Sequence, residues 1–239
     1  RKGHVQFAIE VKLPERQTSL AAHREMLATC QQLDVMFGGH QIRPTWAVHE
    51  SLLDAVRHAV PGETDWALLV ETSEQLEESI RRIKRVPGAM RHAAVVSRVT
   101  PTLIQVAELA ALGIRAMLLP SDGDARSQRV QTRHGLSMVR TTGVFPGPGR
   151  FLGRWDEAFQ AKGLVHRAMM RDSTEAISLQ LDRIHQPTKA LRSLQKTLAI
   201  THRLQAAGRL ASETLLQTHG RLCPAQRGTS SQQSVLRAA

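Results

Sequence analysis

Seven short apolar runs alternate with helix-like stretches along most of the chain, and this alternation constrains the fold more than any other feature. The runs occupy residues 5–11, 42–48, 66–70, 93–97, 115–119, 136–142 and 176–181. Parallel strands buried on both faces have continuous apolar sequences of this length, and amphipathic helices connect them. The pattern therefore predicts an α/β fold with a parallel sheet, which becomes a barrel if the sheet closes on itself.

Six helices are predicted between and after these runs. They are expected at residues 19–33, 51–59, 73–86, 102–112, 156–170 and 188–207. In the third of them, Thr72 or Ser73 can cap the first turn, and Arg81 and Arg82 lie towards the end where positive charge is favourable. Residues 141–154 are too rich in Gly and Pro for regular structure, so we predict a long loop over the strand ends.

A single domain is expected over residues 1–219, because one repeating unit extends along most of the 239 residues. From residue 220 the sequence turns polar, which predicts a disordered tail over residues 220–239. No apolar run approaches the roughly 20 residues that cross a bilayer, so no membrane span is expected. The chain begins with Arg1, as a fragment or processed product would, and a soluble cytoplasmic protein is slightly favoured over an exported one. The sequence carries no signal for the oligomeric state.

The chain is basic, with 32 Lys and Arg against 21 Asp and Glu and a formal net charge of +11. Such a charge favours anionic partners. The basic residues are dispersed, however, and aromatic residues make up 3% of the chain, without any Tyr. The stacking surface of a single-strand nucleic-acid binder is therefore missing, and nucleic acid is the less favoured partner.

The candidate functional residues lie at the C-terminal ends of the predicted strands, because parallel strands bring these ends to one edge of the sheet. The polar residues there are Glu10, Lys12, His49, Glu50, Glu71, Arg98, Asp122, Arg140, Asp182 and His185. One interpretation is a set of ion pairs that closes the mouth of the barrel, and the other is a polar pocket. A glycine-rich phosphate loop and a Gly-x-Ser-x-Gly motif are both absent, which argues against nucleotide binding and against a serine hydrolase.

The order of the segments resembles the polysaccharide deacetylase, or NodB-homology, family over residues 5–216. Residues 5–10 (VQFAIE) are similar to the first strand of the family, which ends in an Asp-bearing catalytic motif. Residues 43–48 (RPTWAV) are similar to its second strand, and residues 97–101 (SRVTP) lie where the family has Arg-x-Pro-Tyr. Members adopt a distorted (β/α)7 barrel. The resemblance therefore implies a distorted (β/α)7 barrel of parallel strands, in agreement with the seven apolar runs.

The same resemblance implies an altered metal site. Active members hold a divalent metal with an Asp and two His spaced His-x-x-x-His, and the matching positions here are Glu10, Glu71 and Gln75. Two carboxylates and an amide form a poor zinc site, although Mg²⁺ or Ca²⁺ prefers such oxygen ligands. We therefore expect no metal cofactor. If a divalent metal does bind, its ligands are Glu10 and Glu71.

The acid-base residues of the family are also replaced. Its general base falls on Val11 or Lys12, and the His of its closing motif appears as Ser178, with His185 a few residues downstream. Each acid-base role contributes about 10²- to 10⁴-fold to a rate, so activity should be lost by several orders of magnitude. No catalytic residue is assigned, and a non-catalytic relative is expected.

The function expected for such a relative is carbohydrate binding in a polar pocket at the strand ends. The candidate residues are Glu10, His49, Glu71, Gln75, Arg98, Arg140 and His185. Two arginines there favour an anionic sugar. Two alternatives remain open: an active metal-dependent deacetylase or hydrolase with substituted ligands, and a basic interaction protein that binds nucleic acid or an acidic partner.

Overall fold

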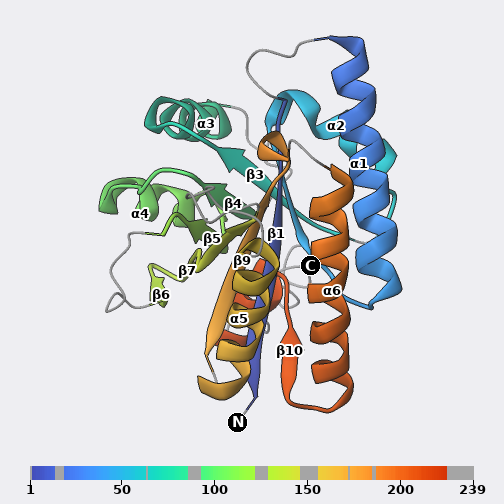
Figure 1. Cartoon of the computed structure of the whole chain (residues 1–239). Coiled ribbons are helices and arrows are strands. Elements are labelled where there is room, and N and C mark those ends of the chain that lie inside the picture. The colour runs from blue at the N-terminus through green and yellow to red at the C-terminus, as the bar shows by residue number, and fades with distance from the viewer. Residues whose placement is uncertain are drawn as a thin grey trace, which may run out of the picture.

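A ten-stranded sheet forms the centre of the computed structural model, which describes residues 2–13, 19–62, 64–85, 93–121, 129–145, 156–171, 173–184 and 187–224 (Figure 1). The strands are β1 (Gly3–Val11), β2 (Thr45–Val48), β3 (Asp65–Val70), β4 (Ala94–Ser97), β5 (Ala116–Leu119), β6 (Val130–Arg133), β7 (Leu136–Arg140), β8 (Gly143–Phe145), β9 (Thr174–Gln180) and β10 (Leu210–Ser212). Their order is β6-β7-β5-β4-β3-β2-β1-β9-β8, and β10 pairs with β1. Every pair is parallel except β6 with β7.

Helices follow most of the strands and cover the outside of the sheet (Figure 1). They are α1 (Leu20–Gly39), α2 (Leu53–Ala59), α3 (Ser73–Arg85), α4 (Leu103–Ala111), α5 (Asp156–Arg171), α6 (Pro187–Ala206) and α7 (Leu215–Leu222), with short 3-10 turns η1 (Glu50–Leu52) and η2 (Leu181–Arg183). The helix starts follow from the sequence. Ser19 caps α1, and Thr102 and Gln105 form a reciprocal capping box at α4.

Each of the seven apolar runs contains a strand, and each of the six predicted helices is present. The boundaries differ in places. Helix α1 continues to Gly39, and β8 occupies the start of the predicted loop at 141–154, whose remainder lies outside the described residues. Helix α7 continues into the predicted tail as far as Leu222, while residues 225–239 are not described.

Alternate residues of the strands separate a small-residue interior from a bulky exterior. The buried interior contains one alanine from each of six strands, Ala8, Ala47, Ala67, Ala94, Ala116 and Ala176. The strand positions that face the outside carry larger side chains, such as Phe7, Trp46 and Met117. These side chains belong to the hydrophobic clusters on the outer face of the sheet. Because the inner side chains are the smaller ones, the sheet can curl tightly towards them.

The curl brings the two ends of the sheet together at residues 141–142. The Thr141 N–H donates to Leu119 O of β5 at 2.9 Å, whereas the next N–H, of Thr142, donates to Ala176 O of β9 at 2.8 Å. The Thr142 hydroxyl oxygen also accepts from the Ala176 N–H at 2.9 Å. The chain therefore crosses from one end of the sheet to the other within two residues, and the predicted distorted barrel is confirmed.

Helix α7 covers the N-terminal end of the barrel. Leu215 is 1% exposed and packs within the alanine-lined interior, and its N–H donates to Thr45 Oγ1 at 3.0 Å. The neighbouring Thr214 hydroxyl donates to the carboxylate of Asp65, which begins β3. The interior is therefore filled from this side, so a site inside the barrel is expected at the C-terminal ends of the strands. Within the described ranges, no helix is long and apolar enough to span a membrane.

Replacing Leu215 by Ala should destabilise the fold by about 2–5 kcal/mol, because the alanines around it cannot extend into the cavity. The free energy of unfolding from urea denaturation measures the loss. Leu20→Ala is the control, since Leu20 is 78% exposed and its truncation should change the free energy by no more than about 0.5 kcal/mol. Equal losses in the two variants would contradict the placement of α7 in the barrel.

Candidate functional site

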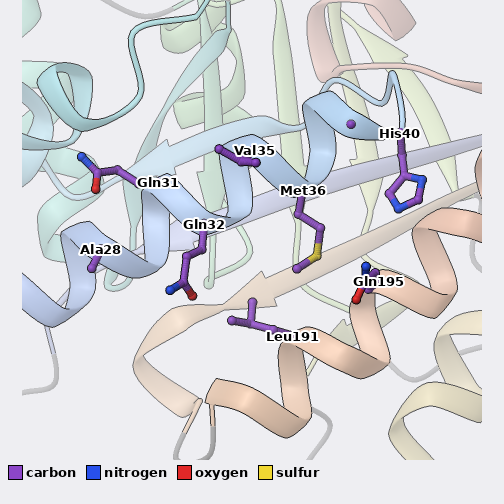
Figure 2. Close-up of a pocket in the computed structure, with 9 residues that line it drawn as sticks. Ala28, Gln31, Gln32, Val35, Met36, His40, Leu191 and Gln195 are labelled. Carbon is purple, nitrogen blue, oxygen red and sulfur yellow. The ribbon is translucent and has the colours of Figure 1, made fainter.

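A groove between α1 and α6 is one hollow in the surface, with a volume of about 680 Å³ (Figure 2). Its lining is mostly apolar and amide side chains, from Ala28, Gln31, Gln32, Val35, Met36, Gly39, His40, Leu191 and Gln195. Helices α1 and α6 lie side by side on the outside of the barrel (Figure 1). The lining of the groove includes no strand-end residue, so it is separate from the predicted pocket.

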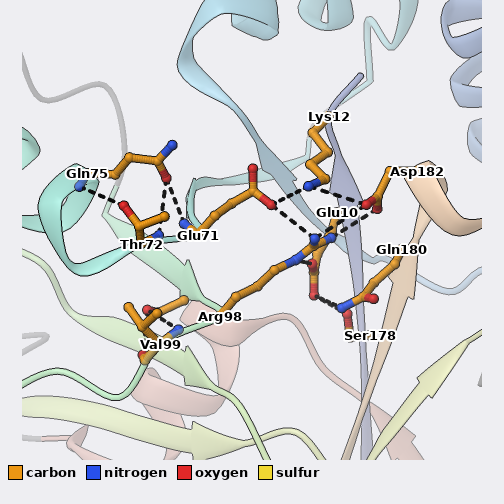
Figure 3. A network of polar contacts seen from close by, with 11 residues as sticks. Glu10, Lys12, Glu71, Thr72, Gln75, Arg98, Val99, Ser178, Gln180 and Asp182 are labelled. Carbon is orange, nitrogen blue, oxygen red and sulfur yellow. Dashed lines mark hydrogen bonds and ion pairs between the residues drawn. The ribbon is translucent and has the colours of Figure 1, made fainter. Parts of the chain in front are cut away.

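A cluster of five charged side chains lies at the C-terminal ends of the strands (Figure 3). This strand-end cluster consists of Glu10, Lys12, Glu71, Arg98 and Asp182. Glu10 is in β1 and Lys12 lies just beyond it, whereas Glu71 and Arg98 immediately follow β3 and β4, and Asp182 lies in η2 after β9. Side chains that are far apart in sequence therefore meet because parallel strands end at one edge.

The two-residue period of the strands explains why these side chains meet. Ala8, Leu69 and Val96 belong to the buried interior cluster, and Glu10, Glu71 and Arg98 each lie two residues further along. Residues at such a spacing point to the same side of a strand, so each charged residue continues an inward-facing row. Pairing adds Gln180, which is opposite Glu10 in the register of β1 and β9.

Arg98 lies at the centre of the cluster and joins three carboxylates. Its Nε donates to Glu10 Oε2 at 2.6 Å and its Nη1 to Glu71 Oε1 at 3.0 Å. Nη2 donates to Asp182 Oδ1 at 3.0 Å, with Nη1 at 3.4 Å from Asp182 Oδ2. A guanidinium presents five donors in a rigid plane, so this one side chain can fix β1, β3, β4 and the end of β9 relative to one another.

Lys12 is the second cation of the cluster. Its Nζ lies 2.6 Å from Glu71 Oε1 and 3.4 Å from Asp182 Oδ2. Three carboxylates and two cations give the five residues a formal charge of −1 when all are ionised, which is −3 for the acids and +2 for the bases. One negative charge is therefore uncompensated within the cluster.

Neutral groups complete the surroundings of Glu10. Its Oε1 accepts a hydrogen bond from the Ser178 hydroxyl and a longer one from Gln180 Nε2 at 3.4 Å. Glu10 is the most buried member of the cluster, with 4% of its side chain exposed, compared with 20% for Glu71. Burial of a charge is costly unless it is paired and hydrogen bonded, and Glu10 meets both conditions.

Burial and pairing act in opposite directions on the ionisation of Asp182 and Arg98. Burial raises the pKa of Asp182, but hydrogen bonds and charges from Arg98 and Lys12 outweigh it, so the pKa lies below its ordinary value. Burial likewise lowers the pKa of Arg98, but the hydrogen bonds that Arg98 donates to Asp182 and the charge of Glu10 outweigh burial and raise the pKa. Both residues therefore stay charged at neutral pH.

The structure brings three of the seven predicted pocket residues together, namely Glu10, Glu71 and Arg98. Gln75 has a local role: its Oε1 accepts from the backbone N–H groups of Glu71, at 2.9 Å, and Thr72, at the start of α3. The His49 ring Nδ1 lies 2.9 Å from Ser51 Oγ, so its polar contact is within its own segment.

The remaining two predicted pocket residues are at the end of β7 and beyond η2. Arg140 is half-buried at the end of β7, and the described contacts of the strand-end cluster do not include it. His185 lies outside the described residues.

Lys12 and Asp182 are at strand ends in the sequence but are not among the predicted pocket residues, and Ser178 is there only as the residue that replaces a family histidine. The spacing of some of these residues does carry a signal. Lys12 follows Glu10 by two residues and Gln180 follows Ser178 by two, so each pair continues one inward-facing row. Asp182 lies beyond β9 in the 3-10 turn η2, where this spacing gives no such signal.

The residues that match the metal ligands of the resembled family do not fit a metal in this arrangement. The carboxylates of Glu10 and Glu71 both accept from the guanidinium of Arg98, which a metal would have to displace. The Gln75 oxygen is engaged by two backbone N–H groups. Within the part of the chain that the structure describes, no group of three His, Cys, Asp or Glu is arranged to hold a metal ion.

Replacing Arg98 by Met should reduce stability at pH 7 by about 3–5 kcal/mol, because three carboxylates lose the cation that joins them. The deficit should shrink at pH 4, where Asp182, no longer held ionised by Arg98, begins to bind a proton and the repulsion falls. Urea unfolding at both pH values measures it, and Arg98→Lys, which keeps the charge but not the planar donor set, should lie between the wild type and Arg98→Met. A loss below about 1 kcal/mol, typical of an exposed ion pair, would contradict the central role of Arg98.

The lowered pKa of Asp182 predicts an acid-dependent loss of stability. A carboxyl group with a lowered pKa binds fewer protons when folded, so it stabilises the fold above the ordinary pKa of 3.8 and this contribution disappears as the pH falls through the folded value. Asp182→Asn should therefore flatten the decline in unfolding free energy below about pH 4. Glu25→Gln, at an exposed position of α1, is the control and should decline as the wild type does. Parallel declines in Asp182→Asn and wild type would contradict the pairing.

Comparison with known proteins supports the fold but does not show an activity, because the similar structures share few residues with this chain. No protein-family model matches the sequence, and no curated protein matches it either. The structure is similar to that of a candidate polysaccharide deacetylase from Mycobacterium smegmatis, with a TM-score of 0.68 and 10% identity over 94% of this chain and 91% of that one. It is also similar to part of a 4-α-glucanotransferase from Thermococcus litoralis, with a TM-score of 0.54 and 11% identity over 90% of this chain and 39% of that one. The chain therefore has a deacetylase-like distorted barrel fold.

Proposed function

We propose that this protein is a non-catalytic relative of the polysaccharide deacetylases that binds a polar carbohydrate at the strand-end cluster. The observation that carries the proposal is the position of Arg98, whose guanidinium donates to the carboxylates of Glu10, Glu71 and Asp182. An ion-pair cluster then takes the place that the resembled family gives to a metal centre.

The chemistry of the cluster argues against catalysis. The Arg98 guanidinium does not lose its proton in proteins, so it cannot act as a general base. Glu10 is nearly buried and accepts from Arg98 and Ser178, which leaves it poorly placed to activate a water molecule. Loss of both the base and the metal ligands removes the elements on which hydrolysis in this fold depends.

The same residues offer features that suit a sugar. Glu71, Lys12 and Arg98 keep between 13% and 20% of their side chains exposed, so donors and acceptors alternate over a short distance at the rim. Carboxylate oxygens have further lone pairs that can accept from hydroxyl groups. The two structurally similar proteins are both named for carbohydrate chemistry, which supports a sugar as the ligand.

The geometry favours a ligand that is not anionic. Arg98 is engaged by three carboxylates, and the cluster has a formal charge of −1. A sugar carboxylate would therefore meet a net negative site. The earlier expectation of an anionic sugar rested on Arg98 and Arg140, and Arg98 is already paired.

Incubation with an N-acetylglucosamine tetramer tests both parts of the proposal. We expect no acetate release with or without added Zn²⁺, Co²⁺ or Mg²⁺, and we expect ligand-observed NMR to detect binding that weakens in Glu71→Gln. Glu25→Gln is the matched exposed control and should bind as the wild type does.

Two outcomes would contradict the proposal. Stoichiometric metal together with acetate release that Glu71→Ala abolishes would show an active enzyme with substituted ligands. Absence of sugar binding, together with salt-sensitive binding to a nucleic acid or an acidic protein, would favour a basic interaction protein instead.

A further inference from the structure

A buried hydrogen-bond acceptor lies beside the strand-end cluster, and it has no donor among the residues that the structure describes. Gln180 is 6% exposed, and none of the described residues donates a hydrogen bond to its Oε1, whereas its Nε2 lies 3.4 Å from Glu10 Oε1 (Figure 3). Turning the amide over would bring two oxygen atoms together, so Glu10 fixes its orientation. A buried acceptor is costly when unpaired, so a bound group that donates a hydrogen bond to this oxygen would be favoured.

The charge of the surroundings indicates what kind of donor this is. The five charged residues of the cluster sum to −1, and their two cations, Lys12 and Arg98, are already paired with carboxylates. A ligand group that donates a hydrogen bond and carries a positive charge would satisfy Gln180 and also compensate the remaining negative charge. In a carbohydrate, the group with both properties is a protonated amine.

We propose that the site is selective for an amino sugar with a free ammonium group, which donates to Gln180 Oε1 and lies against the carboxylates of the cluster. This inference rests on the proposed carbohydrate-binding function and specifies its ligand class. An N-acetylated sugar can donate through its amide but leaves the charge uncompensated. A uronic acid adds a further negative charge to the site.

The positive net charge of the whole chain disfavours a cationic ligand, whereas the negative charge of the strand-end cluster favours one. The formal charge is +11, but it is dispersed, and at about 0.15 M salt charges more than roughly 8 Å away are largely screened. The paired groups of the cluster lie within hydrogen-bond distances of one another, so their net charge acts locally. The preference should therefore be measured at this ionic strength, where the local charge dominates.

Binding of three matched tetrasaccharides by isothermal titration calorimetry tests the inference: a glucosamine oligomer, an N-acetylglucosamine oligomer and an oligogalacturonate. Since a hydrogen bond to a charged group is worth more than one between neutral groups, we expect the glucosamine oligomer to bind about tenfold more tightly than its acetylated counterpart. Gln180→Leu should remove most of this advantage. Gln31→Leu, at an exposed position of α1, should leave it unchanged.

The pH dependence in wild-type protein gives a second readout that needs no variant. Affinity for the glucosamine oligomer should fall as the pH rises and the sugar amine loses its proton, while affinity for the acetylated oligomer should change much less. This comparison decides the question even if Gln180→Leu fails to fold.

The outcomes separate this inference from the proposed function. Tighter or equal binding of the acetylated or anionic oligomer, or an unchanged advantage in Gln180→Leu, overturns the amino-sugar preference and leaves carbohydrate binding in place. Failure of all three oligomers to bind overturns the carbohydrate-binding function itself.

Discussion

The hydrogen bonds from Arg98 to three carboxylates are the interaction on which the C-terminal end of this barrel depends. Glu10, Glu71 and Asp182 come from three separate parts of the sheet, and without a cation between them they would repel one another at short range. The planar guanidinium supplies donors in several directions at once, which a single ammonium cannot do in the same geometry. It therefore joins the ends of these strands to one another.

The curl of the sheet makes this convergence possible. Inward-facing alanines on six strands allow the strands to approach the barrel axis, and the crossing at Thr141 and Thr142 brings the far end of the sheet to β9. Helix α7 fills the N-terminal end with Leu215. The opposite end of the barrel, at the C-terminal ends of the strands, is polar. There the inward-facing rows change from small apolar residues to charged ones.

The sequence was sufficient for the fold because buried parallel strands leave a strong local signal. It was insufficient for three strands whose signal is weak: β6 is polar, pairs antiparallel and is partly exposed, while β8 and β10 have three residues each. The candidate site could be predicted only for residues whose neighbours follow from their position at a strand end, as for Glu10, Glu71 and Arg98. His49 and Gln75 were also at such positions, but nearby groups engage their side chains, and local capture of this kind depends on rotamers rather than on strand order. Conversely, the two-residue spacing from Glu10 indicates the direction of Lys12, whereas Asp182 lies in the 3-10 turn η2, where the strand period no longer applies.

We propose that the Arg98 guanidinium takes the place that the resembled family gives to a metal ion. Crystals grown with excess Zn²⁺, with anomalous diffraction recorded at the zinc edge, would test this. We expect the guanidinium of Arg98 between Glu10, Glu71 and Asp182, with no anomalous peak among them. An anomalous peak at that position, with Arg98 turned away from the carboxylates, would contradict it.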